Sequence, residues 1–134
     1  YTTVATDRHF ARLQNMVAEA QAGGAQIIEV NPAKETLDPA KRILPPTLVL
    51  NPPAQSKLMS EEIFGPILPI LPYRSLDEAI RYVNEHDRPL ALYHFDLDSE
   101  RTRRVLDSTI AGGVTVNDCV LHIAQSALPF GGIG

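Results

Sequence analysis

The second half of the chain alternates helix and strand, and this alternation limits the possible folds more than any other feature of the sequence. Ser75 and Glu78 form a capping box that opens the first of these helices. The helices are expected at about 76–86 and 100–108, and the strands at 90–95 and 114–117. Strand–helix–strand order builds right-handed crossover units on a parallel sheet. We therefore predict an α/β fold with a mainly parallel sheet and flanking helices.

The first half is richer in proline and predicts a less regular addition, with a possibly antiparallel edge. A helix from about Thr6 to Ala22 carries one apolar stripe, formed by Phe10, Leu13, Val17 and Ala20. A short strand is expected at 25–30, and a helical turn at 56–60. Because proline has no amide to donate, we expect 43–50 to be an edge strand or an irregular extension. Segment 67–73 is expected to be largely buried, but not a fully paired central strand.

The bulk numbers exclude several classes of protein. The 134 residues suit one compact domain or a piece of a larger one, and we treat 1–134 as a single partial domain. The net charge of −4 and the absence of a basic stripe argue against nucleic acid as a partner. One cysteine excludes an internal disulfide and favours a reducing compartment, and no apolar run approaches the roughly 20 residues of a membrane span. We expect a soluble cytoplasmic protein.

Cys119 is the obvious candidate nucleophile, but its setting argues against that role. A reactive cysteine needs a cationic or helix-N-terminal environment. Segment 119–123 is rich in valine and leucine and is expected to continue extended after a kink at Asn117-Asp118. On a strand, His122 would then lie on the opposite face from Cys119. We interpret Cys119 as a small, buried, apolar residue.

No other motif completes a catalytic site. The four histidines, of which His9 is expected to face outward beside the first helix, lack the spacing of metal ligands. No nucleophile elbow and no phosphate-binding glycine-rich turn is present between a strand and a helix. We predict no metal and no catalytic residue within the chain. The start at Tyr1 and the glycine-rich end suggest a piece of a longer protein.

One stretch, Ser60-Glu61-Glu62-Ile63-Phe64-Gly65-Pro66, combines acids, an aromatic residue and a Gly-Pro turn. Acids and aromatics that share a tight turn are placed to hold a ligand. The alternative is a solvated glutamate pair that precedes a core phenylalanine. Composition alone favours this alternative.

Several motifs along the chain change that balance. They are Glu61-Glu62-Ile63-Phe64-Gly65-Pro66, Ser75-Leu76-Asp77-Glu78-Ala79-Ile80, Pro89-Leu90-Ala91-Leu92-Tyr93, Gly112-Gly113-Val114 with Asn117-Asp118, and Leu128-Pro129-Phe130-Gly131-Gly132. Their order and spacing resemble those of NAD(P)-dependent aldehyde dehydrogenases over essentially the whole chain. The Pro-Leu-Ala-Leu-Tyr and Asn-Asp forms of these motifs resemble the class-3 branch of the family. Within that branch, Leu121-His122-Ile123-Ala124-Gln125 is most similar to the coniferyl aldehyde dehydrogenases.

The resemblance implies that this is the C-terminal part of the catalytic domain. The family's nucleophilic cysteine, its general base and its cofactor domain then lie upstream of Tyr1, so these 134 residues alone are expected to be inactive. Glu62 resembles the residue that accepts hydrogen bonds from the nicotinamide ribose, and Phe64 the aromatic beside the nicotinamide ring. Phe130 resembles part of the substrate-tunnel wall, whereas Glu61 has no such role and is interpreted as structural.

The implied function is oxidation of an aldehyde, aromatic in the coniferyl branch, to the carboxylic acid with NAD or NADP. The expected partners are the aldehyde, the cofactor and further copies of the chain, because the family's catalytic domain pairs an edge strand with a neighbouring subunit. The competing interpretation is a non-catalytic α/β module for binding or oligomerisation, in which exposed edges drive association.

Overall fold

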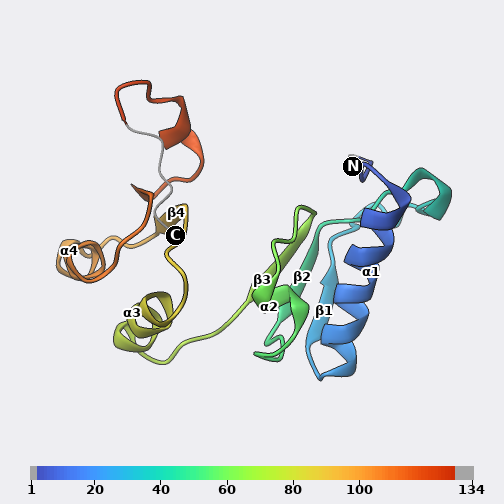
Figure 1. The fold of residues 1–134 in the computed structure, drawn as a ribbon, viewed down its shortest axis with the longest axis horizontal. Coiled ribbons are helices and arrows are strands. Elements are labelled where there is room, and N and C mark those ends of the chain that lie inside the picture. The colour runs from blue at the N-terminus through green and yellow to red at the C-terminus, as the bar shows by residue number, and fades with distance from the viewer. Residues whose placement is uncertain (1–2, 129–134) are drawn as a thin grey trace. The chain divides into compact units, whose positions relative to one another are not determined.

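The computed structural model describes residues 3–128, which belong to two compact units (Figure 1). Unit 1 spans Tyr1–Pro72 and unit 2 spans Tyr73–Gly134, and each is described by itself. The interpretation of 1–134 as one partial domain stays a prediction.

The first helix, α1 (Asp7–Ala22), forms as its apolar spacing predicts. Thr6 caps it, since its hydroxyl accepts a hydrogen bond from the amide of His9 at 3.1 Å. Its buried face adds Met16 to the predicted stripe, while Val17 is only partly buried. The helix ends at Gly23, whose amide donates to the carbonyl of Glu19.

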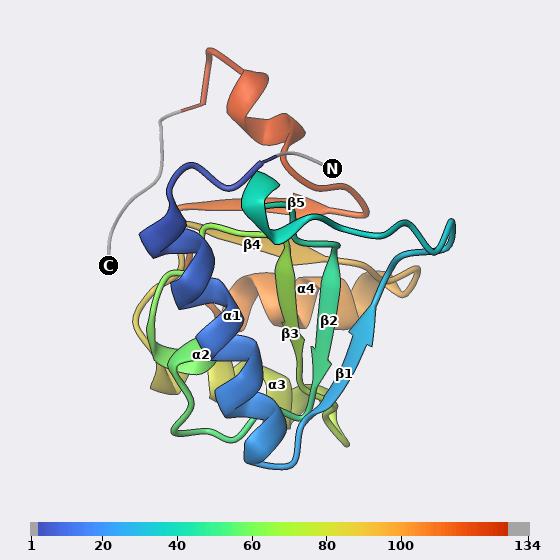
Figure 2. The same ribbon diagram turned by 90° about the vertical axis from the view of Figure 1, so that its right-hand side faces the viewer.

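A three-stranded sheet forms the rest of unit 1, and α1 lies along one of its faces (Figures 1 and 2). The strands are β1 (Gln26–Glu29), β2 (Thr47–Leu50) and β3 (Ile67–Ile70), with the 3-10 turn η1 (Pro39–Lys41) and the short helix α2 (Lys57–Ser60) between them. Strand β2 pairs antiparallel with β1 and parallel with β3. Leu13, Met16 and Val49 are fully buried between helix and sheet.

Strand β2 is central in this sheet, so the expectation of an edge strand or irregular extension at 43–50 is wrong. Pro45 and Pro46 precede the paired residues, and the first strand amide, that of Thr47, donates to the carbonyl of Pro66 at 2.8 Å. No ladder hydrogen bond is therefore lost to proline. The carbonyl of Pro46 even accepts a hydrogen bond from the amide of Val30.

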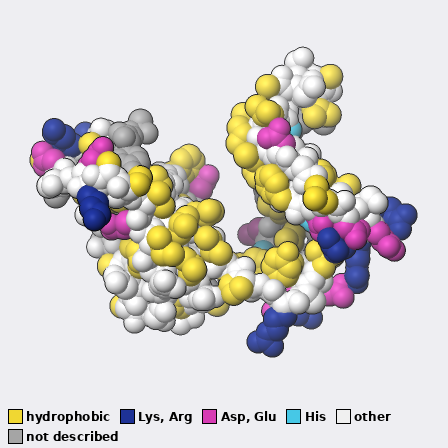
Figure 3. Space-filling view, turned by 180° about the vertical axis from the view of Figure 1, so that it is seen from behind, with side chains coloured by type: hydrophobic (Ala, Val, Ile, Leu, Met, Phe, Trp, Pro, Cys, Tyr) yellow, Lys and Arg dark blue, Asp and Glu magenta, His cyan; other side chains and the backbone are white. Residues whose placement is uncertain are grey.

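Strand β3 tolerates Pro69 because, among residues 3–128, it pairs only with β2. That agrees with the prediction that it is no fully paired central strand. The expectation that 67–73 is largely buried is wrong, because Leu68 is 58% exposed and only Ile67 is buried. Hydrophobic side chains reach the surface of both units, as Figure 3 shows for one face.

Unit 2 contains the predicted crossover unit. Helix α3 (Leu76–Glu85) is followed by β4 (Ala91–His94), α4 (Ser99–Ser108) and β5 (Gly113–Val116). Strands β4 and β5 are parallel and lie side by side next to α4 (Figure 2). The expected α/β fold is confirmed, since in the described part of the chain two of the three pairings between named strands, β2–β3 and β4–β5, are parallel.

The helix caps of unit 2 also agree with the sequence. Ser75 accepts from the amide of Glu78, and the Glu78 carboxylate accepts in turn from the amide of Arg74, one residue earlier than a capping box requires. Asp98 caps α4 by accepting from two successive amides. Two hydrogen bonds from the guanidinium of Arg101, at 2.6 and 2.7 Å, hold the pKa of the Asp96 carboxyl far below its usual range.

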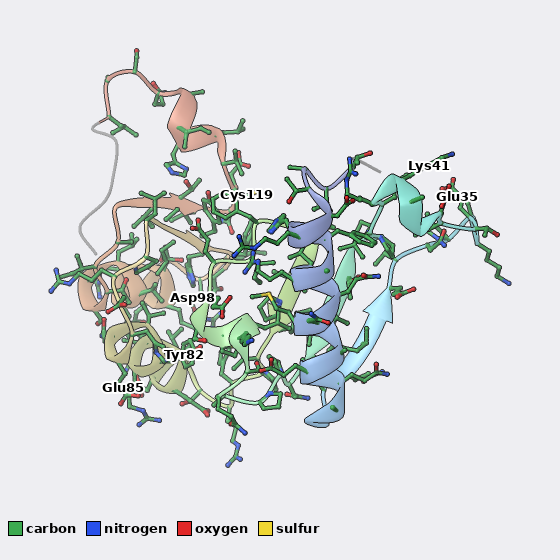
Figure 4. The ribbon with its side chains drawn as sticks, turned by 45° about the vertical axis from the view of Figure 1, so that its right-hand side comes forward. Glu35, Lys41, Tyr82, Glu85, Asp98 and Cys119 are labelled. Atoms are coloured by element: carbon green, nitrogen blue, oxygen red, sulfur yellow. The ribbon has the colours of Figure 1, made fainter. Side chains whose placement is uncertain are left out.

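The chain does not continue extended after β5, so both expectations for Cys119 are wrong. Asn117 and Val120 have positive φ angles of 58° and 66°, which bend the backbone into the 3-10 turn η2 (Leu121–Ala124). Cys119 therefore lies in the loop between β5 and η2 and is exposed rather than buried (Figure 4). Within residues 3–128, no helix combines the length and the apolar character needed to cross a bilayer.

Candidate functional site

The turn at 61–66 links α2 to β3 in an unusual backbone conformation. We call it the cofactor turn, after the role that the family resemblance implies for Glu62 and Phe64. Phe64 has a φ of 48°, in the left-handed region that costs a bulky residue on the order of 1–3 kcal/mol. The next residue is glycine, and a larger residue would not fit there, because a Cβ at position 65 would lie 2.5 Å from Cδ1 of the buried Leu13. The amide of Ile67 then donates to the carbonyl of Gly65 at 2.8 Å, which closes the turn.

Two side chains of α1 hold the cofactor turn by its main chain. Nη2 of Arg12 donates to the carbonyl of Glu62 at 3.0 Å and to that of Ile63 at 2.7 Å. Nε2 of His9 donates to the carbonyl of Phe64 at 2.7 Å, since a carbonyl can only accept. Three consecutive carbonyl groups are thus bound from one helix that lies about fifty residues earlier in the chain.

This conformation turns the Phe64 ring outward. The ring is 74% exposed and contributes to a groove of about 780 Å³. The groove is lined by Thr3, Val4, Ala5, His9, Arg12, Leu44, Pro46, Phe64, Gly65 and Pro66. The alternative of a core phenylalanine is wrong for this structure.

The two glutamates of the turn differ in their contacts. Glu61 accepts from Nη1 of Arg12 at 3.3 Å, which agrees with a structural role. The side chain of Glu62 is exposed, and its carboxylate has no hydrogen bond or ion pair to any residue of 3–128. An ionised carboxylate can only accept hydrogen bonds. The turn therefore offers a flat ring for stacking and, two residues earlier, free acceptors for hydroxyl groups.

A second cavity, of about 490 Å³, lies in unit 2 between the start of the β4–β5 pair and the η2 segment. Its walls include Leu90, Tyr93, His122, Ile123 and Leu128. The His122 ring packs 3.0 Å from where a Cβ on Gly113 would stand, and its centroid lies 5.7 Å from that of Tyr93. Mostly apolar walls of this kind suit an apolar or aromatic ligand.

The sequence predicted some of the residues that meet at the cofactor turn and missed others. Glu62 and Phe64 share one turn, as the resemblance implies, whereas Phe130 lies outside the described residues. The expectation that His9 faces outward is wrong, because it is half-buried and bonded to Phe64. Arg12 was not identified; its only signal is a cation placed directly beside the apolar stripe of α1. Among residues 3–128 no cluster of His, Cys, Asp or Glu could hold a metal ion.

Comparison with known proteins identifies the family to which this chain belongs. Residues 1–134 match the model of the aldehyde dehydrogenase family over the whole chain, and the protein belongs to that family. It is 54% identical over 135 residues to a probable coniferyl aldehyde dehydrogenase of Caulobacter vibrioides, and 40% identical over 136 residues to a mouse aldehyde dehydrogenase named dimeric and NADP-preferring. Each alignment covers 100% of this chain but 28% of the relative.

Solved structures agree with this assignment. A substrate-bound AldH of Staphylococcus aureus superposes with a TM-score of 0.85 at 39% identity, over 98% of this chain and 27% of that one. Aldehyde dehydrogenase C of Pseudomonas syringae, in a complex with NAD+ and octanal, gives a TM-score of 0.80 at 27% identity, over 98% and 26%. The predicted family, and the predicted similarity to coniferyl aldehyde dehydrogenases, are confirmed.

Proposed function

We propose that this chain is the C-terminal part of the catalytic domain of an aldehyde dehydrogenase that oxidises an aldehyde to the carboxylic acid with NAD or NADP. The observation that carries the proposal is the cofactor turn, which presents Phe64 to a groove although its backbone conformation is unfavourable. Family membership adds the kind of ligand, since relatives are named as NADP-preferring or are complexed with NAD+.

The residues of the turn fit the nicotinamide half of such a cofactor. When bound, the nicotinamide supplies the acceptor for the hydride that leaves the substrate. The Glu62 carboxylate is free to accept hydrogen bonds from ribose hydroxyls, and the exposed ring of Phe64 can pack beside the nicotinamide. Both residues act by fixing orientation rather than by moving protons. The nucleophilic cysteine and the general base are proposed to lie upstream of Tyr1.

An aromatic aldehyde such as coniferyl aldehyde is the proposed substrate. The relative from Caulobacter vibrioides is named for that aldehyde. In unit 2, the cavity beside Tyr93 and His122 offers apolar walls to an aromatic ring. Phe130, two residues beyond Leu128 of that cavity, remains the predicted wall of the substrate tunnel.

Replacing Glu62 with glutamine in the full-length enzyme is expected to slow hydride transfer by about tenfold to 100-fold. Glutamine keeps the shape of the side chain but loses its charge and one acceptor oxygen, so the ribose is held less firmly. Stopped-flow absorbance of the reduced cofactor in a single turnover measures this rate, and equilibrium titration measures cofactor affinity, which should change less.

Glu35→Gln provides the matched control, because Glu35 lies in the loop between β1 and β2 (Figure 4). Within residues 3–128 only its main chain is hydrogen-bonded, to the side chain of Asn31. Its rate should equal that of the unaltered enzyme. An unchanged single-turnover rate in Glu62→Gln would remove Glu62 from the proposed site.

We also propose that the intact protein is a homo-oligomer that acts in the cytoplasm. Strand β1 pairs only with β2 among residues 3–128, and Ile28 on it is exposed, so this edge can add a strand from another copy. The single cysteine favours a reducing compartment. Light scattering of the full-length protein should give at least twice the mass of one chain, and a monomer at high concentration would contradict the oligomer.

A further inference from the structure

The contacts that α1 makes with the cofactor turn go beyond what packing requires. Arg12 is about one-third exposed and could extend into solvent, yet its guanidinium lies against the main chain of residues 62 and 63. We propose that Arg12 and His9 are positioning residues that set the pose of Glu62 and Phe64 by holding their carbonyl groups, an inference that rests on the proposed function. We call this pair the α1 clamp.

The donors of Arg12 are distributed in a way that suits this task. Nη2 binds two carbonyls of the turn, Nη1 binds the Glu61 carboxylate at 3.3 Å, and Nε points to Nδ1 of His9 at 3.4 Å. The planar fork of arginine can make these contacts together, whereas the single ammonium of lysine cannot. The arrangement therefore depends on the shape of the guanidinium and not only on its charge.

His9 completes the clamp through both of its ring nitrogens. Its Nε2 donates to the Phe64 carbonyl, so in the neutral ring Nδ1 is the acceptor that faces Nε of Arg12. Thr6 fixes the first turn of α1 through the amide of His9, which places this ring within hydrogen-bond distance of the Phe64 carbonyl. The two side chains thus support each other as well as the turn.

The left-handed conformation of Phe64 shows why a clamp is needed. A bulky residue keeps such a backbone only where its surroundings determine it. Gly65 against Leu13 fixes the position of the turn, and the amide of Thr47 fixes the carbonyl of Pro66. Only the α1 clamp, among residues 3–128, binds the carbonyls of residues 62–64. Without the clamp, the backbone of Phe64 is expected to leave the left-handed conformation, and the side chain of Glu62 is expected to lose its fixed orientation.

The test compares variants of the full-length enzyme by single-turnover hydride transfer, cofactor affinity and thermal unfolding. Arg12→Met and Arg12→Lys are both expected to slow hydride transfer by about 100-fold, with little change in affinity for NAD+ or NADP+. His9→Gln, which keeps a donor for the Phe64 carbonyl, should be close to the unaltered enzyme, and His9→Leu about tenfold slower. Arg8→Met removes the same charge from α1 at a residue that makes no hydrogen bond or ion pair to the turn within 3–128, and should leave the rate unchanged.

A double variant that combines Arg12→Met with Glu62→Gln tests whether Arg12 acts by positioning Glu62 or only by stabilising the fold. Because Arg12 acts through the turn, Arg12→Met together with Glu62→Gln should slow the reaction less than the product of the single effects. Full activity in Arg12→Lys would overturn the clamp in favour of a simple charge effect. If Glu62→Gln slows hydride transfer but Arg12→Met does not, the clamp is rejected and the proposed function stands. If Glu62→Gln leaves the rate of hydride transfer unchanged, both the proposed function and the clamp are rejected. If Arg12→Met does not fold, the two His9 variants provide the test, and equal rates of hydride transfer in His9→Leu and the unaltered enzyme would overturn the clamp.

Discussion

Replacing Gly65 with alanine is expected to lower the free energy of unfolding by about 2 kcal/mol and to displace the cofactor turn. The added Cβ would lie 2.5 Å from Cδ1 and 2.9 Å from Cδ2 of Leu13. Leu13 is fully buried in the core of unit 1, so a shift of either methyl group would disturb the packing around it. Urea unfolding of the full-length protein, followed by circular dichroism, measures the loss.

A double-mutant cycle identifies the clash as the cause. Leu13→Ala alone should cost about 3 kcal/mol, because it opens a cavity in the core. The same change makes room for the methyl group of Gly65→Ala, so the double mutant should be more stable than the sum of the two losses by about 1 kcal/mol or more. Strict additivity would contradict the clash.

Gly24 offers the matched control. Among residues 3–128, a Cβ on Gly24 would meet no atom within 4 Å apart from its neighbours in sequence, although its φ of 97° is unfavourable for alanine. Gly24→Ala therefore carries backbone strain without a clash, about 1 kcal/mol. Combination with Leu13→Ala should leave that cost unchanged, whereas rescue of both glycine variants would point to a general loosening of the core.

Local rules explain the parts of the fold that the sequence predicted. The stripe of α1, the caps at Ser75 and Asp98 and the order of β4, α4 and β5 depend on residues within a few positions of one another. Spacing and capping chemistry are therefore sufficient to identify them. The same locality explains why the sequence is sufficient to place Glu62 and Phe64 on one turn.

Long-range pairing explains the main errors. Whether 43–50 can form a central strand depends on whether its prolines fall among the paired residues. Strand β2 begins at Thr47, just after the prolines, so all of its amides can pair. The role of Arg12 depends on carbonyls about fifty residues away, which no local pattern reports. The exposure of Cys119 follows from a positive φ at Val120, a conformation that a β-branched residue disfavours and that the sequence therefore gives no reason to expect.

The 134 residues alone are expected to form no NADH or NADPH from any aldehyde, whereas the full-length protein should turn over. The family resemblance implies that the nucleophilic cysteine lies upstream, and the geometry of Cys119 supplies no substitute. Its amide donates to the Asp118 carboxylate and its carbonyl accepts from the amide of Leu121, but within residues 3–128 its sulfur has no basic partner. Exposure alone does not activate a thiol.

Absorbance of the reduced cofactor, followed with aromatic and aliphatic aldehydes, measures this activity in both proteins. Cys119→Ala is the decisive variant because it removes the only thiol of the chain. In the full-length enzyme this change should leave the rate of hydride transfer unchanged, since Cys119 lies in an exposed loop after β5 (Figure 4). Turnover by the 134 residues that disappears in Cys119→Ala would instead make Cys119 the nucleophile, and the division of the site between this chain and the upstream residues would then be wrong.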